Sequence, residues 1–122
     1  MEITVAYSKE RFQFGQPIGA FQAVQHHCAN MLTYLDTSAL ITHHTCELVS
    51  AGTANIADMA KCKAWVSDAC RKLLLLAHQV YGGMGFMEES DLQIYFRRTK
   101  AAEQIFGNAG YHRETVAREL GL

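Results

Sequence analysis

The feature that most constrains the fold is a long stripe of apolar and small residues that recurs every three or four positions. The stripe runs from Phe21 to Val49, and Gly52 follows it. Residues at this spacing lie on one face of an α-helix, because each turn takes about 3.6 residues. The pattern predicts one helix of about eight turns. Its predicted buried face consists of Phe21, Val24, Cys28, Met31, Leu35, Ser38, Thr42, Cys46 and Val49.

A second long helix is predicted after a short link. Asn55 followed by Asp58 is the pattern of a helix N-cap, in which each side chain can bind a free backbone N–H group. The glycine pair Gly82-Gly83 ends the helix. Two long helices joined by a short link pack antiparallel. The predicted buried stripe consists of Ile56, Met59, Val66, Cys70, Leu73, Ala77 and Val80.

Shorter helices are predicted at both ends of the chain. Residues 3–10 have the pattern of the last turns of a helix, a further helix begins near Glu88–Asp91, and the last runs from about Tyr111 to Leu120. Alternating apolar runs and hairpin turn signals are not apparent, so we expect no sheet. We predict an all-α fold, an antiparallel (up-and-down) four-helix bundle that forms a single domain over residues 1–122.

Composition excludes several classes of protein. With 49% hydrophobic and 19% charged residues, the chain is too apolar to be disordered. A net charge of -1 argues against the basic surface that nucleic-acid binding needs. The longest apolar run, Leu73 to Ala77, is too short to span a membrane. Four cysteines without a Cys-x-x-Cys pair indicate a reduced, cytoplasmic protein.

Two histidine pairs, His26-His27 and His43-His44, are candidate metal ligands. Adjacent residues of a helix point in directions about 100° apart, so neither pair can chelate an ion through both rings. A metal site needs three or four converging ligands. We therefore expect surface or interface histidines and no metal site.

Three short motifs are more specific than the helical pattern. The first is Tyr-Ser-Lys-Glu-Arg-Phe-Gln-Phe-Gly-Gln-Pro-Ile over residues 7–18, followed by Phe21-Gln22. The second is Gln-Val-Tyr-Gly-Gly-Met-Gly-Phe over residues 79–86, and the third combines residues 97–98, 105–107 and 116–119. In this order and spacing, the motifs resemble the C-terminal domain of acyl-CoA dehydrogenases. The resemblance covers nearly the whole chain.

The resemblance implies an FAD-dependent oxidation of acyl-CoA thioesters, with electrons passed to an electron-transfer flavoprotein. It also implies a homo-oligomer (dimer or tetramer), or a hetero-oligomer with a related subunit, in which this domain completes the FAD site of a neighbouring subunit. Arg11 matches the arginine that reaches this cofactor, and a planar guanidinium suits a pyrophosphate. Glycine suits close approach to a ligand because it has no Cβ. The other positions matched to the cofactor site are Gln13, Phe14, Gln22, Gln79, Gly83 and Asn108.

The glutamate that commonly acts as the catalytic base in the family is absent from the matching position. The reaction needs a carboxylate near the substrate α carbon, but Phe106 stands at this position and cannot accept a proton. Asn108 replaces the threonine of the same motif. Three explanations remain open. The base lies on an upstream helix, a related partner subunit supplies it, or Glu103, one turn earlier, substitutes for it at a displacement that usually spoils the geometry.

The resemblance further implies that the N-terminal helical domain and the middle β domain of the family lie outside this chain. We therefore expect the isolated chain to be colourless and inactive, and to bind neither FAD nor substrate well. The alternative hypothesis is a non-catalytic partner or scaffold subunit of the same family.

Overall fold

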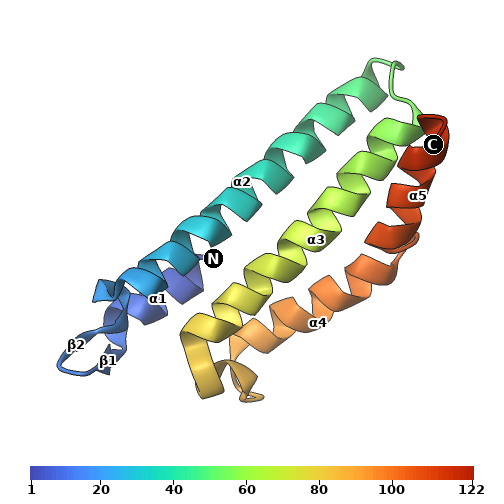
Figure 1. Ribbon diagram of the computed structural model, residues 1–122. Coiled ribbons are helices and arrows are strands. Elements are labelled where there is room, and N and C mark those ends of the chain that lie inside the picture. The colour runs from blue at the N-terminus through green and yellow to red at the C-terminus, as the bar shows by residue number, and fades with distance from the viewer.

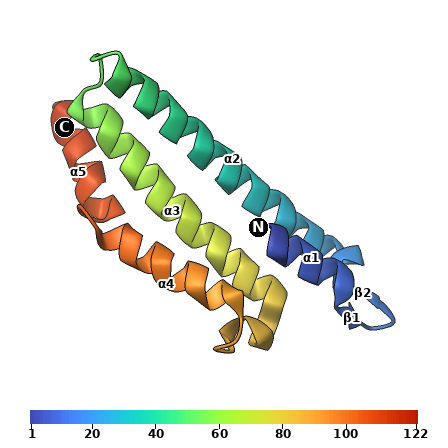
Figure 2. The same ribbon diagram turned by 180° about the vertical axis from the view of Figure 1, so that it is seen from behind.

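The computed structural model describes all 122 residues, which form helices packed side by side (Figure 1). The chain alternates in direction from α1 to α2 to α3, and then α4 and α5 follow one another end to end along α3 (Figures 1 and 2). The prediction of an up-and-down helical bundle is confirmed, with the last two helices sharing one rod. The elements are α1 (Glu2–Glu10), β1 (Phe12–Gln13), β2 (Gln16–Pro17), the 3-10 helix η1 (Ile18–Ala20), α2 (Gln22–Ser50), α3 (Ile56–Tyr81), the 3-10 helix η2 (Gly82–Phe86), α4 (Asp91–Gln104) and α5 (Ala109–Glu119).

Side-chain caps begin two of the helices. The Asp58 N–H donates to Asn55 Oδ1 at 2.8 Å, and the Asn55 N–H donates to Asp58 Oδ2 at 3.3 Å. This reciprocal pair is the capping box that the sequence predicts for α3. The Tyr111 N–H donates to Asn108 Oδ1 at 3.0 Å, so the side chain of Asn108 caps α5 through a single bond.

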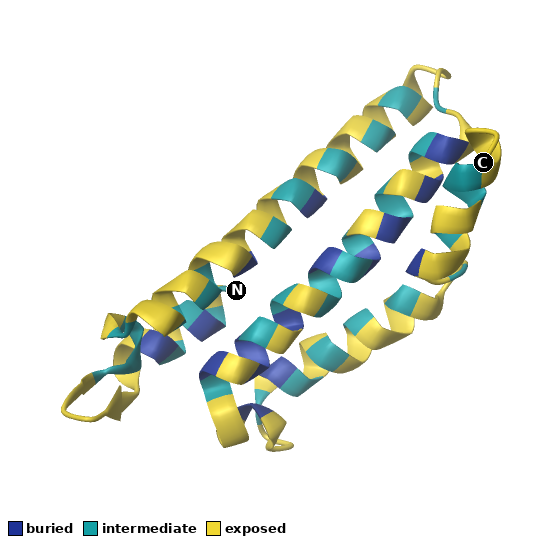
Figure 3. Cartoon of the chain, in the orientation of Figure 1, coloured by how far each residue is buried: buried dark blue, intermediate teal, exposed yellow.

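Small residues form the buried face of α3. This helix packs against α1, α2, α4 and α5, and side chains the size of alanine allow several neighbours to approach one helix closely. The predicted stripe is wrong at its start, because Ile56 and Met59 are exposed while Ala57 and Ala60 are buried. In Figure 3, most of the buried positions of the chain lie on α3. They are Ala57, Ala60, Ala64, Ser67, Ala69, Leu74, Ala77, His78 and Val80.

The predicted face of α2 is correct only in part. Met31 and Ser38 are buried, but Leu35 and Val49 are exposed. The reason is that α1 has only nine residues and lies beside only the first part of α2 (Figure 1). Beyond that point α2 is covered only on the side that packs against α3. Side chains on its other sides, such as Val49, are exposed to solvent.

The expectation that the chain has no sheet is wrong. Strands β1 and β2 form an antiparallel hairpin in which Phe12 pairs with Pro17 and Gln13 pairs with Gln16. The turn residues Phe14 and Gly15 have φ angles of 54° and 81°. Two-residue hairpin turns of this type need positive φ at both positions, a conformation that asparagine and glycine usually supply. Because phenylalanine is uncommon at the first position of such a turn, the sequence pattern did not indicate a hairpin.

The centre of the core lies between α2, α3 and α4. Met31, Leu74, Ala77 and Leu92 form one buried cluster, and Met31 is fully buried. None of the helices combines the length and the apolar composition that a membrane span requires.

We predict that Met31→Ala destabilises the chain by about 2–5 kcal/mol, because it leaves a cavity at a fully buried site. Leu40→Ala on the same helix is the matched control. Leu40 is 71% exposed, so its truncation should change stability by about 0.5 kcal/mol or less. Urea denaturation of both variants measures the difference, and equal losses would contradict the assigned core.

We predict that the rate at which each cysteine is alkylated falls as the burial of its thiol increases. All four cysteines are free, and Cys46 is exposed. Burial raises the pKa of the Cys28 and Cys70 thiols, which lowers the fraction of reactive thiolate at any pH below the raised value. Mass spectrometry after brief iodoacetamide treatment at pH 8 should find Cys46 labelled first and Cys70 late. Labelling of Cys70 before Cys46 would be incompatible with this packing.

Candidate functional site

The C-terminal end of α1 presents Arg11 to solvent. The Arg11 N–H donates to Tyr7 O at 2.9 Å, and Arg11 O accepts the Ile18 N–H at 2.8 Å. These two bonds fix the backbone at the start of the hairpin. The side chain is exposed and forms no ion pair with any residue of the chain. Its guanidinium is therefore available to an anionic group.

The hairpin displays Phe14 at its tip. The residue is 91% exposed and has a positive φ of 54°, and its ring meets only the edge of Phe21, at 6.1 Å between centroids. Left-handed backbone at a residue other than glycine costs about 1–3 kcal/mol, and such strain gathers at functional positions. Phe14 is thus not a core residue of this chain. Gln13 beside it and Gln22 at the first turn of α2 are also exposed.

The glycine turn after α3 forms the second half of this region. Gln79 is exposed in the last turn of α3, and Gly82 ends the helix with a φ of 59°. No heavy atom lies within 4 Å of the position that a Cβ on Gly83 would occupy. The chain itself therefore does not require glycine at position 83. Gly85 differs, because a Cβ there would lie 2.9 Å from Tyr81 Cβ.

Two stacked tyrosines join α1 to the end of α3. The rings of Tyr7 and Tyr81 lie 4.2 Å apart at an interplanar angle of 8°, and Tyr81 Oη donates to Ile3 O at 3.1 Å. Burial raises the pKa of Tyr81, and the nearby Tyr7, Asp91 and Glu10 raise it further. The phenol therefore stays a donor to the α1 carbonyl. This contact, between residues far apart in the sequence, was not predicted.

Six of the seven predicted cofactor contacts lie at the same end of the bundle, on two separate segments. The hairpin and the glycine turn both lie at the end where α1 and α3 finish (Figure 1). A free guanidinium, an exposed aromatic ring and an open backbone turn are groups that can contact a phosphate and a planar ring system. These residues are Arg11, Gln13, Phe14, Gln22, Gln79 and Gly83.

The remaining predicted positions lie elsewhere, at the junction between α4 and α5. Phe106 is 89% exposed with a φ of 61°, and its carbonyl accepts a hydrogen bond from His112 Nε2 at 2.9 Å. Gly107 packs directly on the ring of Tyr111, where a Cβ would lie 2.7 Å from Tyr111 Cδ1. The Asn108 side-chain oxygen is occupied in capping α5. The junction therefore holds an aromatic ring outward and offers no carboxylate at position 106.

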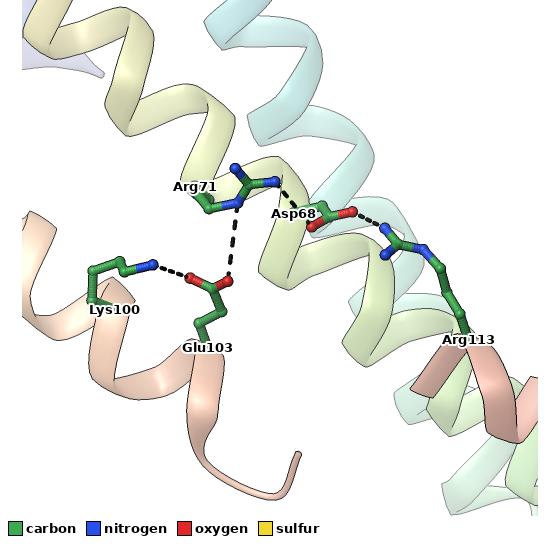
Figure 4. A network of polar contacts seen from close by, with 5 residues as sticks. All are labelled: Asp68, Arg71, Lys100, Glu103 and Arg113. Atoms are coloured by element: carbon green, nitrogen blue, oxygen red, sulfur yellow. Dashed lines mark hydrogen bonds and ion pairs between the residues drawn. The ribbon is translucent and has the colours of Figure 1, made fainter. Parts of the chain in front are cut away.

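Glu103 belongs to a chain of ion pairs that crosses three helices (Figure 4). Its carboxylate lies 3.0 Å from Lys100 Nζ and 4.0 Å from Arg71 Nε. Arg71 continues to Asp68 on α3 at 3.4 Å, and Asp68 pairs with Arg113 on α5. The network holds α4 and α5 against α3 on either side of the Phe106 junction.

No group of three or more histidine, cysteine, aspartate or glutamate side chains is arranged to hold a metal ion. The four histidines of the pairs His26-His27 and His43-His44 all lie along α2, where only His27 is partly covered.

Comparisons with known proteins agree with these motifs. Residues 1–121 match the model of the family described as "Acyl-CoA dehydrogenase, C-terminal domain". The acyl-CoA dehydrogenase IpdE2 of Mycolicibacterium smegmatis is 34% identical over 107 residues, which are 88% of this chain and 33% of that protein. The chain thus spans about a third of the length of this relative.

Solved structures share the fold. An FAD complex of PigA superposes with a TM-score of 0.91 at 30% identity, over 99% of this chain and 32% of that one. A structure described as an electron transferring flavoprotein of Acidaminococcus fermentans superposes with a TM-score of 0.90 at 31% identity, over 96% and 31%. Because the family model covers nearly every residue, the chain belongs to the acyl-CoA dehydrogenase family and corresponds to its C-terminal domain.

Proposed function

We propose that this chain acts within an FAD-dependent dehydrogenase that oxidises acyl-CoA thioesters between the α and β carbons, and that it completes the FAD site of a neighbouring subunit. The observation that carries the proposal is that Arg11, the hairpin and the glycine turn all lie at the same end of the bundle (Figure 1). The likeness to a chain solved as an FAD complex supports it.

Each residue at this end has a role that follows from its surroundings. Arg11, which has no partner within the chain, binds phosphate oxygens through its planar fork. Phe14 offers the exposed face of its ring to a planar group, which accounts for its strained backbone. Gly83 lets the ligand approach the backbone, because its Cβ position is open. The exposed amides of Gln13, Gln22 and Gln79 supply hydrogen bonds.

FAD, when bound, supplies the acceptor for the hydride that leaves the substrate β carbon. The proton of the α carbon needs a carboxylate, and position 106 holds phenylalanine. Glu103 is engaged with Lys100 and Arg71, so we assign it a structural role. The base then comes from an upstream helix or from a related subunit.

The second candidate is a non-catalytic subunit of a hetero-oligomer, and Phe106 is the observation that favours it. An aromatic ring that is 89% exposed in place of a carboxylate suits contact with a protein or an apolar ligand better than proton transfer. In both candidates the chain works in an oligomer. This accounts for the large apolar side chains on its surface, such as Leu40, Trp65 and Leu75.

The proposal also includes an electron acceptor and a cellular location. We infer an electron-transferring flavoprotein as the acceptor, which the likeness to the Acidaminococcus structure supports. We also infer a reducing, cytoplasmic location, since all four cysteines are free thiols.

Replacing Arg11 tests the proposal directly. In the assembled flavoprotein, Arg11→Gln should weaken FAD binding by about 10- to 100-fold, because it removes a charge-assisted contact. Isothermal titration of the deflavinated protein with FAD measures the loss. Arg118→Gln, on α5 away from the hairpin (Figure 1), is the control and should bind FAD normally. Equal affinities for the two variants would remove Arg11 from the cofactor site.

A pair of glycine substitutions separates cofactor contact from folding. Gly83→Ala should leave the melting temperature of the chain nearly unchanged, since nothing lies near its Cβ position, yet it should lower FAD affinity in the assembled protein. Gly85→Ala should destabilise the chain itself by about 1–3 kcal/mol through overpacking against Tyr81. If Gly83→Ala binds FAD as tightly as the unmodified protein, no ligand approaches the backbone at that position.

A further inference from the structure

A buried histidine lies beneath the glycine turn. His78 is only 6% exposed and stands in the last turns of α3. Its ring lies 5.0 Å from the ring of Phe86 on η2 and 5.1 Å from the ring of Phe96 on α4, measured between centroids. His78 therefore contacts η2 and α4, the two elements that directly follow α3 in the chain.

The hydrogen bonds around His78 determine its tautomer. Nδ1 lies 2.9 Å from Leu74 O. Since a carbonyl oxygen can only accept, Nδ1 carries the proton. Nε2 lies 3.4 Å from Gln93 Nε2. The amide of Gln93 is oriented by its second bond, in which Nε2 donates to Gly85 O at 2.6 Å. Nε2 of His78 thus accepts the other N–H of Gln93.

One carboxamide group consequently joins three elements. The two N–H bonds of Gln93, a residue of α4, go to His78 on α3 and to the Gly85 carbonyl on η2. Both N–H donors of the amide are used. Only the Nδ1–H tautomer of His78 provides a ring nitrogen, Nε2, that can accept one of these bonds. The short bond to Gly85 O sets the orientation of the amide, and His78 accepts its second N–H, so the two contacts hold Gln93 together.

The backbone of the turn receives one side-chain hydrogen bond from the rest of the bundle. Its five residues include three glycines, which have the largest conformational freedom of any residue type. Gly82, Gly83 and Met84 are exposed, and Gly85 is the one buried residue of the turn. The bond from Gln93 is thus the side-chain hydrogen bond that ties the backbone of η2 to the bundle, beside the packing of the Phe86 ring on His78.

We infer that His78 and Gln93 are positioning residues that hold the Gly82–Phe86 turn in the conformation that exposes the Gly83 backbone to the dinucleotide. The inference rests on the proposed function, since it assigns the turn to cofactor contact. Neither residue touches the ligand, and both act through the carbonyl of Gly85.

The test combines two measurements on Gln93→Glu, which keeps the side-chain shape and removes both donors. Hydrogen exchange of the isolated chain should accelerate about tenfold at residues 85–87, the factor expected from loss of one ordinary hydrogen bond. Exchange in the middle of α2 and α3 should not change. In the assembled flavoprotein, FAD affinity should fall by a similar factor. Gln104→Glu is the matched control, because it makes the same chemical change on α4 at a side chain that forms no hydrogen bond within the chain.

A spectroscopic readout distinguishes positioning from general packing. In the unmodified chain, ¹⁵N chemical shifts of the His78 ring should report the Nδ1–H tautomer, and in Gln93→Glu the Nε2 shift should change because the group that donates to it is lost. Gln93→Met, which also lacks donors but carries no charge, serves if the glutamate variant does not fold.

The possible outcomes are separable. Unchanged exchange at residues 85–87 would overturn the anchoring role of Gln93, and an Nε2–H tautomer in the unmodified chain would overturn that of His78. Faster exchange with unchanged FAD affinity would overturn the link to the cofactor. Failure of the proposed function itself would appear instead in Arg11→Gln, which leaves this anchor intact.

Discussion

The close packing of α3 against four other helices is the constraint on which the rest of the structure depends. Its buried face carries mainly alanine and serine, so neighbouring backbones approach it from several sides. Larger side chains on that face would push α2 and the α4–α5 rod apart. Since only residues 87–90 separate the glycine turn from α4, the position of the turn also follows from this packing. The central helix thus positions the glycine turn directly, and through the stacking of Tyr81 on Tyr7 it also contacts α1, at whose end Arg11 lies.

Two parts of the bundle are held by different kinds of interaction. At the end that carries Arg11, aromatic stacking of Tyr7 on Tyr81 and the amide of Gln93 connect the elements. Along the α4–α5 rod, alternating charges from Lys100 to Arg113 bridge to α3 (Figure 4). Most of these charges are partly exposed, so each pair contributes little by itself. Together they fix the direction in which α4 and α5 leave the Phe106 junction.

Two phenylalanines with positive φ angles mark the places where folding and function make different demands. Phe14 and Phe106 are each almost fully exposed, and each precedes a glycine that also has positive φ. A chain selected only for stability would carry asparagine or glycine at such positions. The strain at Phe14 agrees with contact to a ligand held by another polypeptide. At Phe106 the exposed ring stands at the position where the resemblance places the base, and the proposed function therefore assigns the chain no proton acceptor of its own.

The sequence by itself determined the number and order of the helices, the capping box at Asn55, and the family, because these depend on local periodicity and on short contiguous motifs. It did not reveal the hairpin, since phenylalanine occupies a turn position that local preference assigns to other residues. Nor did it locate the buried faces correctly at Leu35, Ile56 and Met59, whose exposure depends on how far α1 extends and on how many helices surround α3. Only the tertiary structure brought Tyr7 to Tyr81 and His78 to Gln93. Contacts between residues distant in the chain depend on packing geometry, which no spacing within one helix encodes.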